Sequence, residues 1–359
     1  MHYELCIILV LAWFLDLAFG DPSWLPHPVV GFGKMIAWGE RHLNKGRHRM
    51  LKGAIMTILL DSIVFLATFY ILTLLPPLGR AGVGLITIFY CLAGTTLIRE
   101  VRAVFLALDR SLDDGRRQVA RIVGRDTTQL SAQEVRTAAL ETLAENLSDG
   151  VIAPLFWLAV GGVPAMLTYK MINTQDSMIG YRTERYKDFG CWAAHIDDIA
   201  NYIPARLTAL LMIIVPTHSP LEPPPTPSQG GGMNRQATNE KEEIIQAVVP
   251  NTEVEKDETN NNEVAHAPSL GGSRGRFHFI RRYGRAHASP NSGYPEAALA
   301  SILNCRFGGP HSYFGVVVEK PYIGNNDRPL TTADMRVAVR VNRTAECIAV
   351  FLCAIALLF

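Results

Sequence analysis

The sequence has little charge for its length, and its charges nearly cancel. Only 19% of the 359 residues are Asp, Glu, Lys or Arg, and the formal net charge is +1. This balance gives no electrostatic reason to expect nucleic-acid binding, so no nucleic-acid partner is predicted. Hydrophobic residues make up 48% of the chain, and the mean hydropathy is +0.14. Apolar and polar residues are separated into long blocks, which is typical of a membrane protein.

Paired cysteines and the common phosphate-binding motifs are also absent. The six cysteines are scattered without paired spacing, which indicates neither a disulfide framework nor a zinc site. The chain has no Walker A motif and no G-x-G-x-x-G dinucleotide fingerprint. Any chemistry therefore has to come from polar clusters of another kind.

The apolar blocks predict membrane helices. Residues 1–20 lack a basic start and a cleavage site, so they are predicted to remain as a helix and not to be removed as a signal peptide. Residues 53–75 are long enough to span a bilayer, and 81–98 return after a turn. The loop before this hairpin is rich in Arg and Lys, which predicts a cytoplasmic location for it and for the chain after residue 98.

Three further segments complete the expected organisation. Residues 151–167 are apolar but interrupted at Gly161 and Pro164, which favours a re-entrant or bent segment. Residues 217–280 are rich in Pro, Gly, Asn and charge, which predicts a disordered insert. We therefore expect an all-α, polytopic integral membrane protein whose active-site region lies on the cytoplasmic side. Its parts are membrane helices with interleaved polar segments at 1–216, the insert at 217–280, and a motif region with a terminal membrane helix at 281–359.

An acidic stripe precedes the interrupted apolar segment. In "ETLAENLSDGVIAP", Glu141, Glu145 and Asp149 are spaced four residues apart and share one helix face. A solvated face usually interleaves Lys or Arg, and none lies between Glu141 and Asp149. The pattern therefore favours a bound Mg²⁺ or a bound cationic group over a plain solvated face.

A second polar cluster follows the same apolar segment. In "YKMINTQDSMIGYRTERYKDFG" and "CWAAHIDDIANYIPARLTAL", Asn173, Asp176 and Ser177 share a helix face, and Asp197 and Asp198 reach Asn201 one turn later. Carboxylates and carboxamides at these spacings suit a Mg²⁺ ion that holds phosphates. A plain interfacial loop on lipid headgroups would explain the neighbouring Arg and Lys residues but not the Asp and Asn residues.

Two more clusters are weaker on pattern alone. "GDPSWLPHPVVGFG" is equally compatible with a simple turn after the first helix. In "HASPNSGYPEAALASILNCRFGGPHSYFG", Pro295 and Glu296 begin a helix whose N-terminus could bind an anion.

Taken together and in this order, these motifs closely resemble the adenosylcobinamide-phosphate synthases, the CobD/CbiB family of cobalamin biosynthesis. The resemblance covers nearly the whole chain except the segment 217–280, where the family connection is normally short. It implies a membrane enzyme, a ligase that joins a carboxylate of adenosylcobyric acid to aminopropanol phosphate, or to aminopropanol, as an amide. It also implies that the reaction requires ATP and Mg²⁺ and that the protein is surrounded by membrane lipid. The resemblance is compatible with a homo-oligomer.

The residues that match family motifs receive hypothetical roles. The metal ligands are expected to be Asp176, Asp197 and Asp198, with Lys170 and Arg206 on phosphate oxygens and Glu145 or Asp149 as the base that deprotonates the amine. Glu141 completes the catalytic set. The expected substrate-binding residues are Asn146, Asn173, Ser177, Tyr181, Arg182, Asn201, Ser289, Asn291 and Glu296.

Two other functions compete with this interpretation. Membrane prenyltransferases also hold Mg²⁺ and a diphosphate with Asp-rich helices, but only Asp197–Asp198 with Asn201 resembles such a motif. A transporter is favoured mainly by Asp16 and Asp61, which lie inside apolar segments.

Overall fold

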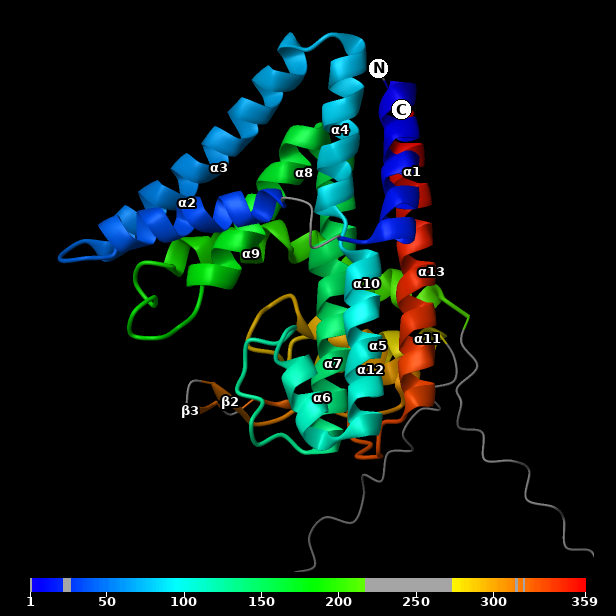
Figure 1. Cartoon of the computed structure of the whole chain (residues 1–359). Coiled ribbons are helices and arrows are strands. Elements are labelled where there is room, and N and C mark those ends of the chain that lie inside the picture. Colours follow the sequence, from blue (N-terminus) through cyan, green and yellow to red (C-terminus); the bar gives the residue numbers. More distant parts are fainter. Residues whose placement is uncertain (1, 22–26, 217–272, 314–315, 319) are drawn as a thin grey trace, which may run out of the picture. The chain divides into compact units, whose positions relative to one another are not determined.

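The computed structural model describes residues 2–21, 27–216, 273–313, 316–318 and 320–359 (Figure 1). Helices dominate this part of the chain, as predicted. They are α1 (His2–Phe19), α2 (Pro28–Leu43), α3 (Arg49–Leu74), α4 (Pro77–Cys91), α5 (Gly94–Arg110), α6 (Leu112–Val119), α7 (Ala132–Leu147), the π-helix η1 (Ser148–Ile152), α8 (Ala153–Ile179), α9 (Cys191–Ala200), α10 (Tyr202–Ile214), α11 (Ser273–Tyr283), α12 (Gly293–Leu303) and α13 (Thr332–Ala356).

Strands contribute only two short ladders within the described residues. β1 (Phe307–Gly308) pairs antiparallel with β4 (Tyr322–Ile323), and β2 (His311–Tyr313) pairs antiparallel with β3 (Val316–Val318). The first ladder places the Gly308 backbone beside α7, where it contributes to the site described below.

In the part of the chain that the structure describes, three helical stretches are long and apolar enough to cross a membrane: Arg49–Leu74, Pro77–Arg110 and Ala132–Ile179. The predicted hairpin of two apolar helices is confirmed as α3 and α4, although α4 already begins at Pro77 inside the segment expected to be the turn. Proline is well suited to the first turn of a helix, because its missing N–H has no helical partner there. Helix α3 leans away from α4 and exposes many apolar side chains, including Ile55, Ile58, Leu59, Ile63, Leu66 and Phe69 (Figure 1).

Helix α8 folds back on itself, which confirms the predicted bent segment. Gly161 and Gly162 leave the helical conformation, and Gly162 adopts φ +68°, which glycine tolerates far better than residues with a Cβ. A straight helix would separate residues 149 and 169 by about 30 Å. Instead, the Tyr169 hydroxyl lies 3.4 Å from the Asp149 carbonyl oxygen. The segment therefore reverses direction, and its second arm returns to the level at which the first arm began.

Buried polar pairs tie the membrane helices together. Asp16 on α1 accepts hydrogen bonds from the Thr95 backbone and hydroxyl on α5, at 3.1 and 2.9 Å. Asp61 on α3 accepts from Gln175 on α8 at 2.7 Å. Such contacts are a structural use of intramembrane carboxylates. The two residues that suggested a transporter therefore have partners in neighbouring helices.

The predicted insert ends earlier than expected. Most of it, residues 217–272, lies outside the described residues, so the prediction of disorder there is not addressed. Residues 273–280, however, belong to helix α11, which contacts α10 and α12. Ile280 is buried in the main core. The low-complexity composition ends before this helix, and the buried Ile280 side chain explains why it is ordered.

We expect the segment 220–269 to be dispensable, because residues 1–219 and 270–359 form one compact unit without it. Replacing 220–269 with a short Gly/Ser linker should leave membrane insertion and thermal stability in detergent close to those of the parent. A second deletion that extends to residue 280 removes the buried Ile280 and should lower the melting temperature by several degrees. Equal behaviour of the two deletions would contradict this boundary.

Candidate active site

The site lies where the helical hairpin of α8 opens. Helix α7 approaches it with a complete capping box, in which Ser131 and Glu134 satisfy each other's backbone N–H groups, as the sequence predicted. It continues through η1, which carries Asp149, into the first arm of α8. The second arm brings back Tyr169, Lys170 and Asp176, and α9 packs against it. Residues far apart along α7–α8 therefore meet at one level.

A chain of hydrogen bonds connects the second arm of α8 with α9 and its C-cap residue Asn201. The Tyr169 hydroxyl donates to Asn201 Oδ1 at 2.8 Å, and Asn201 Nδ2 donates to Asp197 Oδ2 at 3.0 Å. The predicted contact between Asp197 and Asn201, one turn apart, is therefore confirmed. Tyr169 and Asn201 are each 1% exposed. They hold Asp197 opposite Asp149 in a fixed position.

Four aspartates, Asp149, Asp176, Asp197 and Asp198, form a carboxylate cluster. The charges of Asp176 and Asp197 both act on Asp149, and that of Asp198 acts on Asp176. Burial, reinforced by the repulsion from Asp176, raises the pKa of Asp197 to about 8. Burial also raises the pKa of Asp198 above its usual value. The fold thus holds several carboxylates together at a cost in stability, which is characteristic of functional sites.

Lys170 is the cation whose charge acts on Asp149 from the second arm of α8. The same charge acts on Asp21 and His27, which belong to the motif after the first helix. Burial raises the pKa of Asp21 and lowers that of His27. The motif interpreted as either a simple turn or a site therefore reaches the carboxylate cluster, and both residues were missing from the predicted site set.

The donor set of the carboxylate cluster is chemically suited to Mg²⁺. Its ligands are hard oxygens, and Asp197 Oδ1 is buried without a hydrogen-bond partner. Among the described residues, no group of three or more His, Cys, Asp or Glu side chains is close enough to hold a metal ion by itself. The assignment of Asp176, Asp197 and Asp198 to a metal stays a prediction. Such an incomplete set of protein ligands would suit an ion that keeps water or substrate oxygens among its ligands.

Next to the carboxylate cluster, a cavity of about 180 Å³ opens beside α7. We call it the glutamate cavity. Glu141 accepts from Arg125 at 2.7 Å and from the Gly308 N–H at 2.7 Å, and Glu145 accepts from the Ser292 hydroxyl at 2.9 Å. Its other lining residues include Asn146, His287, Glu296 and Lys320.

The acidic stripe therefore does not act as one unit. Arg125, from the loop before α7, neutralises Glu141, although no basic residue lies between Glu141 and Asp149 in the sequence. Glu145 remains, and its charge acts on both Asp149 and Glu296. It stands between the carboxylate cluster and the glutamate cavity. The sequence predicted that a bound cation offsets the repulsion among all three acidic residues. This prediction is wrong for Glu141, which Arg125 already neutralises.

Glu296 is 4% exposed in the first turn of α12. Burial, followed by repulsion from Glu141 and Glu145, raises its pKa well above the usual value for Glu. Burial lowers the pKa of His287, whose Nε2 lies 3.9 Å from Glu296 Oε1. Both side chains are therefore biased toward their neutral forms, in which they can hydrogen-bond a ligand without adding charge.

We expect Glu296→Gln to flatten the pH dependence of stability. A carboxyl group whose pKa is raised by folding stabilises the native state at low pH, and this contribution is lost as pH rises through the folded-state pKa. The parent should therefore lose up to about 1.4 kcal/mol of unfolding free energy per pH unit across that range from this one group. Melting curves from pH 5 to 8.5 should show a smaller loss for Glu296→Gln. A steeper loss in the variant would contradict the raised pKa.

Arg206 lies in a different cavity, where its guanidinium is stacked between Tyr202 and Tyr294 at 3.6 and 4.1 Å from the ring centroids. Asn291 connects it to the cluster: its Oδ1 accepts from Arg206 at 3.1 Å and its Nδ2 donates to the Asp198 carbonyl at 2.8 Å. The Ser289 hydroxyl accepts backbone N–H groups of the same turn. It therefore caps the turn before α12, as helix-entry residues commonly do.

The remaining predicted residues border these two regions. Asn173 lies close enough to Asp197 to lower its pKa slightly, and the charge of Arg182 acts on Asp198. Asn146 donates to the Thr142 carbonyl at the glutamate cavity, and the Tyr181 hydroxyl lies next to Gly124 at its edge. Ser177 is exposed and donates to the Thr174 carbonyl, so it is the predicted residue with the weakest connection to the site.

Sequence reasoning missed Arg125, His287, Lys320 and Tyr169. Arg125 and Lys320 lie in stretches with no pattern of their own, so only the folded chain brings them to Glu141. Tyr169 and His287 are the first residues of two motifs quoted above. Their place in these motifs was the one signal in the sequence that could have identified them.

The chain is similar to known proteins over almost its whole length. A sequence model described as "CobD/Cbib protein" matches residues 9–342. The chain belongs to the CobD/CbiB family. It is 39% identical to the "Cobalamin biosynthesis protein CobD" of Geobacter metallireducens, over 97% of this chain and 95% of the relative. It is 35% identical to the protein of that name from Halalkalibacterium halodurans, over 96% and 95% of the two chains. No solved structure matches the chain.

The carboxylate cluster and the glutamate cavity both lie within the part of the chain that matches the family. The family match includes α7, the hairpin of α8, α9 and α12, and therefore every residue of the carboxylate cluster and of the glutamate cavity.

Proposed function

We propose that this chain acts in cobalamin biosynthesis as an ATP-dependent ligase that joins aminopropanol phosphate, or aminopropanol, to a carboxylate of adenosylcobyric acid. The observation that carries the proposal is Glu145, placed between a buried carboxylate cluster and a small cavity of mixed charge. An amide ligase needs these two features side by side. One positions phosphates around a cation, and the other holds the amine.

The glutamate cavity suits the small amino-alcohol substrate. Its volume of about 180 Å³ is too small for a corrinoid, and its lining combines carboxylates with the cations Arg125 and Lys320. An ammonium group would face Glu145, and a phosphate would face the cations. This arrangement favours the phosphorylated amine over plain aminopropanol. The corrinoid carboxylate would approach from the cluster side.

In the reaction we propose, the corrinoid carboxylate takes the terminal phosphoryl group of ATP, and the amine nitrogen then displaces phosphate to form the amide. Asp176, Asp197 and Asp198 would hold Mg²⁺, which when bound neutralises phosphate charge. Lys170 and Arg206 would orient the phosphate oxygens, because both present fixed positive charge near the cluster. Glu145 would take the proton from the ammonium group.

The position of Glu145 makes it a better candidate base than Asp149. Glu145 is half-buried and lines the glutamate cavity, where the amine would bind. Asp149 is not among the residues that line the cavity and lies among the other aspartates. A base must be within hydrogen-bond reach of the proton it removes, and this geometry favours Glu145.

The fold-back of α8 supports a location of the whole site on one side of the membrane. Asp149 and Asp176 lie on opposite arms of the same hairpin, so a chain that enters the bilayer at residue 151 has returned by residue 169. With the basic loop before α3 in the cytoplasm, this would be the side that contains ATP.

One assay tests the proposal against the competing functions. Detergent-purified protein should release ADP and phosphate only when adenosylcobyric acid, the amine and Mg²⁺ are all present. The product should be the amide by mass spectrometry, with aminopropanol phosphate used more efficiently than aminopropanol. ADP release that does not depend on the corrinoid, or diphosphate release from a prenyl donor, would reject the ligase.

A further inference from the structure

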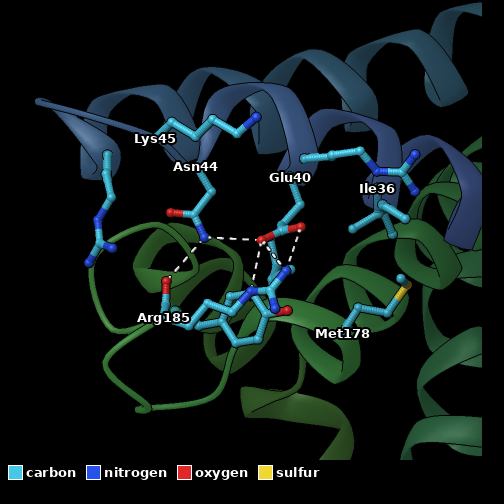
Figure 2. Close-up of a pocket in the computed structure, with 11 residues that line it drawn as sticks. Ile36, Glu40, Asn44, Lys45, Met178 and Arg185 are labelled. Carbon is cyan, nitrogen blue, oxygen red and sulfur yellow. Dashed lines mark hydrogen bonds and ion pairs between the residues drawn. The ribbon is translucent and has the colours of Figure 1, made fainter.

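A larger cavity, of about 530 Å³, lies away from the carboxylate cluster, between α2, the start of α3 and the loop after α8. We call it the arginine cavity. Its partly exposed apolar lining residues include Ala37 and Met178. Figure 2 shows Glu40 at its centre, hydrogen-bonded by Asn44 at 3.2 Å and by two nitrogens of Arg185 at 3.0 and 3.1 Å. These bonds fix the loop 180–190 against α2.

The rim of the arginine cavity carries four cations against one carboxylate. Arg41, Lys45, Arg49 and Arg185 line it, and Glu40 is the single acidic residue. Arg185 is paired with Glu40, and Arg49 with Asp188. The side chains of Arg41 and Lys45 have no hydrogen-bond or ion-pair partner among the described residues. The cavity therefore has positive charge that the protein leaves available to an anion.

The surroundings of the cavity place it at the level of lipid headgroups. The membrane helix α3 begins at Arg49, and its first turns already expose Met50, Leu51 and Ile55, with exposed fractions of 49%, 59% and 56%. Helix α2 exposes Trp38, at 65%. A chain that turns apolar side chains outward directly beside a cationic rim is typical of the membrane interface, where Trp and Arg are anchored.

We propose that the arginine cavity binds the phosphate headgroup of an anionic phospholipid from the adjoining leaflet. The phosphate would contact Arg41 and Lys45 on the rim, and the glycerol and first acyl carbons would cover the partly exposed side chains of Ala37 and Met178. A zwitterionic lipid would gain less, because its own cation would meet the same rim. The loop held by Glu40 and Arg185 begins where α8 ends at Ile179, in the last turn of the helix that carries Asp176, so an occupied cavity also steadies this end of α8.

The test measures lipid retention and not activity. The protein, purified in mild detergent, is titrated with phosphatidylglycerol or phosphatidylcholine and examined by native mass spectrometry. We expect the parent to bind phosphatidylglycerol at least about tenfold more tightly than phosphatidylcholine, and Arg41→Gln/Lys45→Gln to lose most of this preference, since both charged donors to the phosphate are removed. The matched control is Lys34→Gln/Arg47→Gln, which removes two exposed charges outside the cavity lining and should keep the preference.

Three outcomes overturn the proposal. The first is an equal loss in the two double variants, which would indicate diffuse attraction to the surface. The second is an unchanged preference in Arg41→Gln/Lys45→Gln. The third is displacement of phosphatidylglycerol by inorganic phosphate or ATP at lower concentration than the lipid, which would assign the cavity to a soluble phosphate compound. The charge-conserving Arg41→Lys/Lys45→Arg variant should bind like the parent and shows that altered side chains alone do not abolish binding.

Discussion

Asp197→Asn and Asp176→Asn should each lower the turnover of the proposed ligase by about a hundredfold or more, the usual scale for removing a charged group that positions the reacting atoms. Both residues belong to the carboxylate cluster, and Asp197 Oδ1 has no hydrogen-bond partner among the described residues. The amide replacement keeps the shape of the side chain and removes one negative charge. Steady-state ADP release under saturating substrates measures the loss.

The same variants should fold at least as well as the parent. Asp197 is 8% exposed, and burial raises its pKa to about 8, so its charged form is disfavoured when no cation is bound. Asparagine resembles the protonated acid in shape and charge, so the melting temperature in Mg²⁺-free buffer should be unchanged or higher. A stable but inactive variant separates a functional carboxylate from a structural one.

Two further measurements make this prediction strict. Raising the Mg²⁺ concentration should restore part of the lost turnover, because weaker coordination lowers the occupancy of the metal and not the chemistry. Asp113→Asn, which changes an exposed aspartate on α6, should be fully active, since surface ion pairs contribute little. Full activity of both cluster variants, or their failure to fold, would remove the cluster from the catalytic site.

Glu145→Gln should also lower turnover, by about 10²- to 10⁴-fold, which is the range for losing a general base. Unlike the aspartate variants, it should show no recovery with added Mg²⁺. Its defect should shrink as pH rises, because more of the amine is then already deprotonated and needs no base. The pH profile of kcat from 6.5 to 9.5, measured for parent and variant, tests this directly.

Ser292→Ala is the natural companion variant. The Ser292 hydroxyl donates to Glu145 Oε1 at 2.9 Å, so its loss should misplace the carboxylate without removing it and should cost much less turnover than Glu145→Gln. If Asp149→Asn shows the pH-dependent defect and Glu145→Gln does not, the base is Asp149. If neither does, the amine loses its proton before it binds.

The fold was largely predictable because long apolar runs and helix signals are local. The capping box at Ser131 and Glu134, the hairpin of α3 and α4, and the bend of α8 at Gly161 each depend on a few neighbouring residues. The end of the insert was misjudged, because α11 is ordered through burial of Ile280 among helices that composition cannot show.

The candidate site was only partly predictable. Contacts within one helix, such as Asn201 with Asp197, follow from spacing and were predicted correctly. Contacts between elements do not follow from spacing. Arg125 reaches Glu141, and Lys170 reaches Asp21, through the packing of separate segments. The acidic stripe therefore looked uncompensated in the sequence while one of its members is paired.

By itself, the sequence determined that the chain is a helical membrane protein of the CobD/CbiB family, because hydrophobic length, helix period and motif residues are properties of neighbouring positions. Only the tertiary structure decided that Asp149 and Asp176 come close together, because this depends on the reversal at Gly162 and the return of Tyr169 to Asp149. It also decided which acidic residues remain unpaired by a cation, since the partners of a buried charge come from whichever segments pack around it.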